Sequence, residues 1–296
     1  MSIEGKLILA IDFNNMLFGS YYGEKLINSQ GINVNAVKGF FFKMQALKNT
    51  FNPDYIVIAN DLSREQTFRR KLYKPYKAQR KSHDDDIITQ MRYALQLVDL
   101  IGYPLINNPV YEADDVLGMI SKYARDNGAA TIIVSTDRDL YQLLDEGTYI
   151  FLSKTREILD HKWLKEKYKL TPQQWIELKM LQGDRSDNIP GIPGVGEVSA
   201  LRLMQQYGSI DSIYKHLNAL KPSLRDNLIN GKDVLPLTRE LVTIITDYDE
   251  IGITEQSLEM RKCYIQELYQ AIDSMELKSL INVMKYSLLL GKDEGQ

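Results

Sequence analysis

Three short apolar runs, each followed closely by an aspartate, constrain the fold of this 296-residue chain most strongly. Residues 6–11 (KLILAI), 55–59 (YIVIA) and 131–135 (TIIVS) are rich in branched side chains, as are strands buried on both faces of a parallel sheet. Segments with helical periodicity separate the runs, at 36–48, 86–101 and 113–125. Strands that alternate with helices predict an α/β fold with a mostly parallel sheet and right-handed crossovers.

The second half of the chain has a different pattern, because the strand signal fades after about residue 170. Thr171-Pro172-Gln173-Gln174 predicts a helix start with a capping box and proline at the first helical position. A Gly/Pro-rich segment at 183–196 and further helical segments follow. We therefore predict two domains: an α/β domain over 1–171 and an all-helical domain over 172–296.

Composition excludes several classes of protein. The single cysteine, Cys263, rules out an intramolecular disulfide framework, and three scattered histidines disfavour a zinc site, so a bound metal would need carboxylate ligands. No apolar run approaches the roughly 20 residues that span a bilayer, and the N-terminal residues do not resemble a signal peptide. We expect an intracellular, cytoplasmic protein. The net charge of −3 hides basic and acidic segments.

Acidic residues follow all three predicted strands: Asp12, Asp61, and Asp137 with Asp139. A turn or helix cap is the ordinary explanation for one such aspartate, but it explains three less well. Because the carboxyl ends of parallel strands meet at one edge of a sheet, these side chains are expected to converge.

Two further segments add acids. Glu112, Asp114 and Asp115 open a predicted helix, where favourable interaction with the helix dipole explains one or two acids. Asp184 and Asp187 lie three residues apart in a loop that a solvated turn explains equally well. If all these carboxylates lie together, their negative charges repel one another and need cations nearby. A site with only oxygen ligands favours Mg²⁺, with Mn²⁺ as the alternative. Two such ions suit phosphodiester hydrolysis, one activating water and one stabilising the leaving oxygen. The predicted metal ligands are Asp12, Asp61, Glu112, Asp114, Asp115, Asp137, Asp139, Asp184 and Asp187.

A basic segment, REQTFRRKLYKPYKAQRK at 64–81, carries eight positive charges with interleaved tyrosines. A solvated charged surface is the usual explanation of such a run, but this mixture also suits a nucleic-acid backbone with stacked bases. Within this segment, which ends at Lys81, Arg70 is a predicted DNA contact. Lys77 and Arg80 could reach the scissile phosphate and offset its charge. Together with two of the predicted metal ligands, Asp12 and Asp114, they are the predicted catalytic residues.

The glycine-rich segment Gly191-Ile192-Pro193-Gly194-Val195-Gly196 lacks the Gly-Lys-Ser/Thr ending of a P-loop. Ser199 stands where a dinucleotide fingerprint has its third glycine. What remains is a tight hairpin between helices whose N–H groups bind a phosphate, or a plain helix–helix turn. We predict DNA contacts at Gly191, Gly194 and Gly196.

The segments LILAIDFNN, FRRKLYKPYKAQR, YEADDV, STDRDLYQLL and GDRSDNIPGIPGVGEVSA occur in an order and spacing that resemble the 5′ nuclease (flap endonuclease) superfamily. The resemblance is strongest to the 5′-3′ exonuclease domain of bacterial DNA polymerase I and its stand-alone bacterial and phage relatives. It covers Lys6 to about residue 250. It implies a PIN-like fold with a helical arch at about 64–101 and a helix-hairpin-helix module at about 183–207 that grips duplex DNA, often with bound K⁺.

The resemblance also implies an activity: a Mg²⁺-dependent, structure-specific 5′-3′ exonuclease and flap endonuclease that removes 5′ flaps or RNA primers in DNA replication and repair. Such an enzyme is expected to act as a monomer on branched or 5′-ended duplex DNA in a bacterial or phage-infected cell. It implies one metal group of Asp12, Asp61, Glu112 and Asp114, and a second of Asp115, Asp137, Asp139, Asp184 and Asp187. Arg69, Tyr76, Lys77 and Arg80 would form the arch base, and Phe18 would stack on a base.

Two positions depart from the family pattern. Phe13 stands where similar enzymes usually have glycine, and Gly19 stands where they often have arginine, so how the 5′ end is held there is open. Two other functions were weighed: a non-catalytic DNA-junction-binding protein, which would be expected to lack some of the acids, and a PIN-type ribonuclease, which would not need the helical second half.

Overall fold

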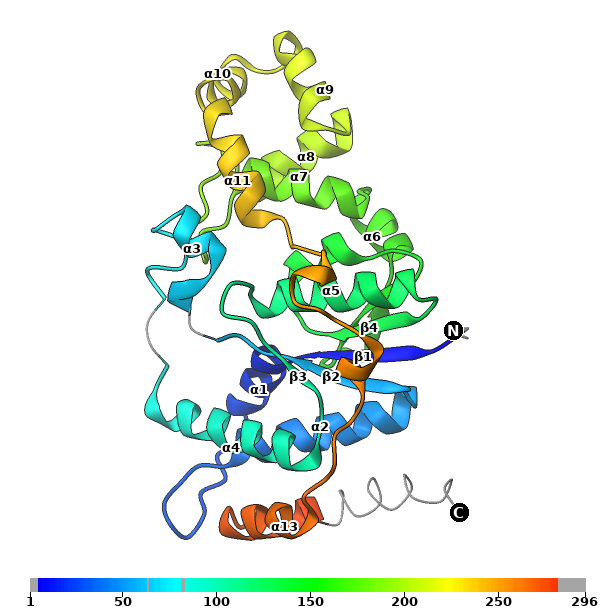
Figure 1. Ribbon diagram of the computed structural model, residues 1–296. Helices are drawn as coiled ribbons and strands as arrows, with labels where there is room; N and C mark the ends of the chain where they lie inside the picture. The colour runs from blue at the N-terminus through cyan, green and yellow to red at the C-terminus, as the bar shows by residue number, and fades with distance from the viewer. Residues whose placement is uncertain (1–4, 63, 81–82, 282–296) are drawn as a thin grey trace.

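The structure is a computed structural model that describes residues 5–62, 64–80 and 83–281. Its centre is a six-stranded sheet in the order β3-β2-β1-β4-β5-β6 (Figure 1). All neighbouring strands pair in parallel except β6, which runs antiparallel to β5. The strands are β1 (Leu7–Asp12), β2 (Tyr55–Ala59), β3 (Leu105–Ile106), β4 (Ala130–Val134), β5 (Thr148–Leu152) and β6 (Glu157–Leu159).

The three predicted strands are confirmed as β1, β2 and β4, and they are neighbours at the centre of the sheet. The other three were not predicted. β3 has two residues and β6 has three, whereas β5, with the sequence TYIFL, is as long as β2 and β4. Because β1 pairs with both β2 and β4, the carboxyl ends of all three lie side by side.

Helices cover both faces of the sheet. Leu9, Ile58 and Ile132 point to one apolar cluster, which includes buried residues of α1 (Phe13–Tyr21), α2 (Asn35–Phe51), α4 (Asp85–Ile101) and α13 (Ile265–Ser274). Ala10, Val57 and Ile133 point to the opposite cluster, with residues of α5 (Ala113–Asp126), η2 (Arg138–Leu143) and α6 (His161–Tyr168). The alternation follows from the two-residue period of a strand.

The second half of the chain is helical, as predicted. Thr171 caps α7 (Pro172–Gln182) in a capping box with Gln174. The helices that follow are α8 (Glu197–Tyr207), α9 (Ile210–Lys215), η3 (Leu217–Ala219), α10 (Pro222–Asn230), η4 (Lys232–Val234), α11 (Leu235–Val242), η5 (Tyr248–Glu250) and α12 (Glu255–Leu258).

The chain does not stay in the helical half. After α11 it runs back past the sheet, and α13 packs against α4 of the first half (Figure 1). Residues 265–280, which the sequence placed in the second domain, therefore complete the core of the first. Residues 282–296 of that predicted domain lie outside the described residues.

The segment expected to form a helical arch begins with η1 (Arg64–Gln66) and α3 (Phe68–Leu72), and continues in turns. Lys81 lies outside the described residues. The rest of the expected range is α4, whose apolar side packs on α2 beneath the sheet. Within the described ranges, no helix combines the length and apolar character needed to cross a bilayer.

Candidate metal and nucleic-acid site

A cavity of about 210 Å³ opens at the carboxyl ends of β1, β2 and β4. Asp12 ends β1 and caps α1, accepting a hydrogen bond of 3.0 Å from the Asn15 amide. Asp61 follows β2 and accepts one of 2.7 Å from the Ala113 amide at the start of α5. Of the nine predicted metal ligands, six line this cavity: Asp12, Asp61, Glu112, Asp114, Asp137 and Asp187.

Burial and neighbouring acids oppose the negative charge on two of these acids, Asp12 and Asp114, and Lys77 offsets part of this effect at Asp114. Burial raises the pKa of Asp12 to about 7, and Asp61 and Asp137 add to the shift, although Asn15 and Ser135 donate hydrogen bonds that oppose it. Burial, with Asp137 and Asp12 as neighbours, also raises the pKa of Asp114 well above its ordinary value. Such raised pKa values indicate that negative charge in the cavity needs a partner.

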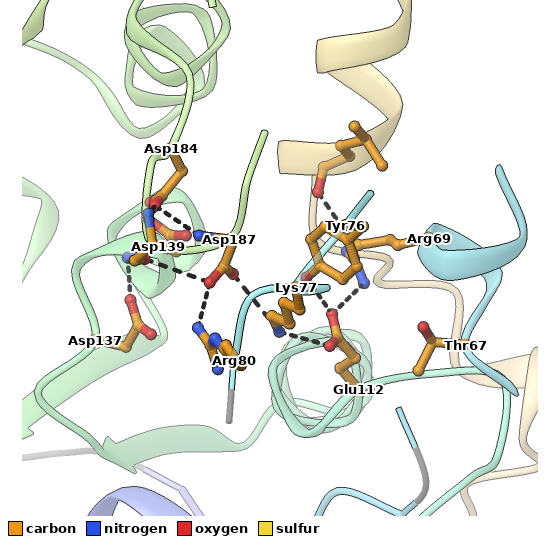
Figure 2. A network of polar contacts seen from close by, with 12 residues as sticks. Thr67, Arg69, Tyr76, Lys77, Arg80, Glu112, Asp137, Asp139, Asp184 and Asp187 are labelled. Atoms are coloured by element: carbon orange, nitrogen blue, oxygen red, sulfur yellow. Dashed lines mark hydrogen bonds and ion pairs between the residues drawn. The ribbon is translucent and has the colours of Figure 1, made fainter. Parts of the chain in front are cut away.

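Lys77 also lines the cavity and lies between Glu112 and Asp187 (Figure 2). Its Nζ is 2.5 Å from Glu112 Oε1 and 3.6 Å from Asp187 Oδ2. The backbone of Lys77 has a φ of +51°, a conformation that non-glycine residues rarely adopt and that is enriched at functional sites. Burial opposes the charge of Glu112, but Lys77 and Arg69 lower the pKa of this carboxyl below its ordinary value.

A second cavity of about 450 Å³ adjoins the first and shares Asp137 with it. It is also lined by Asp139 and Asp184, and the buried Lys179 of α7 lies between these two acids, 2.6 and 2.8 Å away. Burial alone would raise the pKa of Asp184, but Lys179 and Ser186 lower it to about 2. The sequence did not identify Lys179 as a residue of the site. The one feature that could have indicated it is its position one helical turn before Gly183-Asp184.

Asp115 is the one predicted ligand that lines neither cavity. It is fully buried, and both its oxygens bind the guanidinium of Arg69, at 2.6 and 2.8 Å. The same carboxylate accepts hydrogen bonds from the amides of Glu112 and Ile245. Its oxygens are thus used within the fold, and its assignment to a metal group stays a prediction.

The residues predicted to contact DNA divide into two groups. Arg69 and Tyr76 are buried: Arg69 also donates to the Leu241 and Thr243 carbonyls, and the Tyr76 hydroxyl donates to Glu112 at 2.6 Å. Neither offers a surface to a base or phosphate, so both instead attach the basic segment to the rest of the protein. Arg70 donates to the Tyr76 carbonyl within that segment.

The other predicted contacts remain accessible. Phe18 lines the first cavity and lies against His83, with ring centroids 4.8 Å apart. Arg80 is partly exposed beside the same cavity and pairs with Asp187 (Figure 2).

The three glycines of the hairpin have different roles. Gly191 lies where a Cβ would be 2.3 Å from the Gln182 carbonyl carbon, so close backbone packing requires glycine. Gly194 has a φ of +77° in the turn between Ile192 and Val195. Only Gly196, the N-cap of α8, has open space around it. An anion approaching the hairpin would therefore meet the backbone at Gly196.

The donor set suits a hard divalent ion, because it consists of carboxylates and three of them, Asp12, Asp114 and Asp139, carry raised pKa values. Across residues 5–62, 64–80 and 83–281, however, no three Asp, Glu, His or Cys side chains are already arranged around a single ion position. Four carboxylates of the two cavities are engaged in ion pairs: Glu112 with Lys77, Asp187 with Arg80, and Asp139 and Asp184 with Lys179.

Comparison with known proteins gives the family. The sequence model described as "5′-3′ exonuclease, N-terminal resolvase-like domain" matches residues 7–169, and "5′-3′ exonuclease, C-terminal SAM fold" matches residues 170–266. The chain belongs to the 5′-3′ exonuclease family.

Two relatives differ in how much of their own length this chain matches. A 5′-3′ exonuclease of Halalkalibacterium halodurans is 36% identical over 264 residues, which is 84% of this chain and 87% of the relative. The thermostable DNA polymerase I of Thermus thermophilus is 39% identical over 242 residues, which is 81% of this chain but 29% of the polymerase. The chain thus spans about a third of the length of the polymerase relatives that it matches.

Solved structures share the fold. The zinc-bound 5′-exonuclease of bacteriophage T5 superimposes with a TM-score of 0.71 at 20% identity, covering 90% of this chain and 99% of that one. The catalytic core of Rad2 in complex with DNA substrate gives a TM-score of 0.60 at 16% identity, covering 94% and 92%.

Proposed function

We propose that this member of the 5′-3′ exonuclease family is a Mg²⁺-dependent, structure-specific nuclease that cleaves phosphodiesters at 5′ ends and 5′ flaps of duplex DNA, including RNA–DNA primers. The observation that carries the proposal is the cavity at the carboxyl ends of β1, β2 and β4, which Lys77 also lines and where burial and neighbouring acids raise the pKa values of Asp12 and Asp114. The related exonuclease of H. halodurans supports the reaction, and the zinc-bound T5 enzyme supports a divalent ion.

Asp12, Asp61, Asp114 and Asp137 are the residues that would hold Mg²⁺, because all four line the cavity and none forms an ion pair with another described side chain. When bound, the ion would supply charge stabilisation and an activated water for hydrolysis. Asp139 and Asp184, on the adjoining cavity, would serve a second ion.

Lys77 and Arg80 would hold the scissile phosphate. Both now pair with acids at the cavity, Lys77 with Glu112 and Arg80 with Asp187. A phosphate entering between them would accept hydrogen bonds from both and take over part of that pairing. The cations would then stabilise the additional negative charge that develops on the phosphate during cleavage.

The hairpin at Gly196 would grip the duplex away from the cleavage point. Its open surface and the N-terminus of α8 suit a backbone phosphate, without reading base sequence. A K⁺ ion bound by hairpin carbonyls would assist this contact. A monomer would suffice, because the cavity and the hairpin belong to one chain.

The test is cleavage of a 5′-flap duplex labelled at each end in turn, with Mg²⁺, with Mn²⁺ and with chelator. The proposal expects products only with a divalent ion, released from the 5′-labelled strand. Binding without cleavage in Mg²⁺ would instead support a junction-binding protein. Faster cleavage of unstructured single-stranded RNA would support a ribonuclease.

A further inference from the structure

One face of α1 leads from the cavity toward the protein surface. Asn15 and Phe18 line the cavity, and the residues one helical turn further along are Gly19 and Tyr22. Gly19 is exposed, and Tyr22, just beyond the helix, is 83% exposed. A turn rises about 5.4 Å, so this face would pass beside a DNA strand within one or two nucleotides of the cavity.

The gap left by Gly19 is filled by a cation from another helix. A Cβ built on Gly19 would have one neighbour within 4 Å, the Nζ of Lys43 at 3.6 Å. Lys43 belongs to α2, which packs closely on α1: a Cβ on Gly39 would lie 2.7 Å from that of Ser20 (Figure 1). Side chains of a helix lean toward its N-terminus, which directs Lys43 back along α2 toward this crossing.

Lys43 is half-buried, and within the described part of the chain its ammonium has no hydrogen bond or ion pair. Burial lowers its pKa, and no carboxylate contributes an opposing shift. The contrast with Lys77 and Lys179 is clear, since each of those contacts two acids. A partly desolvated cation without an anion is stabilised by whatever anion reaches it.

We propose that Lys43, reaching across Gly19, binds a backbone phosphate of the DNA strand that enters the cavity, with Phe18 and Tyr22 as aromatic neighbours for its bases. The proposal rests on the function proposed above. It also gives the departure at Gly19 a physical meaning: the position needs no side chain of its own, because α2 supplies the positive charge there. Aromatic rings beside a phosphate-binding cation are a common arrangement for single-stranded nucleic acid.

The test compares Lys43→Ala with the parent by fluorescence anisotropy on a 5′-flap duplex, in chelator, at several KCl concentrations. Each phosphate contact contributes about 0.9 to the slope of log K against log salt on duplex DNA, and about 0.7 on a single strand. Lys43→Ala is expected to bind more weakly and to lower that slope by 0.7–0.9. Lys48→Ala is the matched control, because Lys48 is on the same helix and its pKa is likewise lowered by burial; its slope should equal that of the parent.

A rescue variant separates a phosphate contact from a change in folding. Gly19 has an ordinary helical backbone and no obstructing atoms once Lys43 is shortened, so Gly19→Lys is sterically allowed. Gly19→Lys combined with Lys43→Ala should restore the slope, whereas Gly19→Ala with Lys43→Ala should not. An unchanged slope in Lys43→Ala, or no restoration by Gly19→Lys, overturns the inference. If the parent itself neither binds nor cleaves the flap, the proposed function fails as well.

Discussion

Arg69 and Asp115 form a bidentate ion pair inside the protein, with N–O distances of 2.6 and 2.8 Å. From the sequence, the segment of Arg69 is predicted to contact DNA, and Asp115 is predicted to bind metal. Because Arg69 also donates to carbonyls of Leu241 and Thr243, the pair joins the basic segment, α5 and the end of α11. The pair therefore anchors α5 within the fold.

Asp115→Asn is therefore expected to destabilise the fold. Breaking a buried pair by removing one partner costs about 3–5 kcal/mol, and the buried Arg69 charge would then rely on the more distant Glu112 carboxylate, at 3.3 Å. Denaturant unfolding measures the loss. Asp126→Asn is the control, since its partner Lys122 is on the surface and such exposed pairs contribute little to stability. A stable Asp115→Asn variant that no longer bound Mg²⁺ would support the assignment of Asp115 to the metal group.

Asp12→Asn and Asp114→Asn should abolish cleavage with little loss of DNA affinity, because they remove ligand charge and leave Lys77 and Arg80 in place. They should also stabilise the metal-free protein at high pH. The folded pKa of Asp12 is about 7 against an ordinary 3.8, so the folded state keeps a proton that the unfolded chain loses. The free energy of unfolding of the parent should therefore fall by on the order of 4 kcal/mol between about pH 4 and pH 7 because of this group. It should stay at the lower value above pH 7.

Melting the metal-free parent and Asp12→Asn between pH 5 and pH 8 checks this sign. The parent should lose stability across the range, whereas the variant should lose much less. Adding Mg²⁺ at pH 8 should raise the melting temperature of the parent more than that of Asp12→Asn. Equal pH profiles for the two proteins would mean that Asp12 is not an uncompensated acid.

Sequence alone predicted the central strands and the acids after them, because each signal is local: a short branched apolar run and an aspartate at its end. Convergence of Asp12, Asp61 and Asp137 then followed from the rule that parallel strands end at one edge of a sheet. The partners of the cations could not be predicted this way. Whether Arg69 faces DNA or Asp115, and whether Lys179 touches two acids, depends on how α3 and α7 pack, which no local pattern encodes. β3 and β6 were missed because two and three residues are too short for a periodic signal. β5 was missed for another reason, because its apolar run TYIFL is as long as β2 and β4.

Lys77→Ala should slow cleavage by about 10²–10³-fold, the usual loss when one donor to the developing charge is removed. Affinity for the flap should change much less, since the rest of the basic segment remains. Single-turnover cleavage at saturating enzyme separates the two effects. Lys74→Ala, an exposed lysine three residues away, is the control and should alter binding without altering the cleavage rate.

Lys179→Met should lower the stability of the metal-free protein, because Asp139 and Asp184 would lose the cation between them. It should also restore the pKa of Asp184 from about 2 toward its ordinary value. Mg²⁺ should then stabilise the variant more than the parent, since the freed carboxylates are available as ligands. Thermal melts with and without Mg²⁺ measure both effects, with Lys122→Met as a surface control. A smaller response to Mg²⁺ in Lys179→Met than in the parent would show that Lys179 assists metal binding.

Gly194 and Gly196 offer a matched pair for the hairpin. Gly194→Ala should destabilise the protein by about 1–3 kcal/mol, because its φ is +77° and the new Cβ would lie 2.3 Å from Asn227 Nδ2. Gly196→Val should cost less, about 1 kcal/mol from the poorer N-cap of α8, since nothing lies within 4 Å of its Cβ position and its φ is −88°. Its branched side chain would instead keep a phosphate away from the backbone, so duplex binding should weaken. Melting temperature and affinity for a blunt duplex, measured on both variants, distinguish the two roles; normal duplex binding by Gly196→Val would remove the hairpin from the DNA interface.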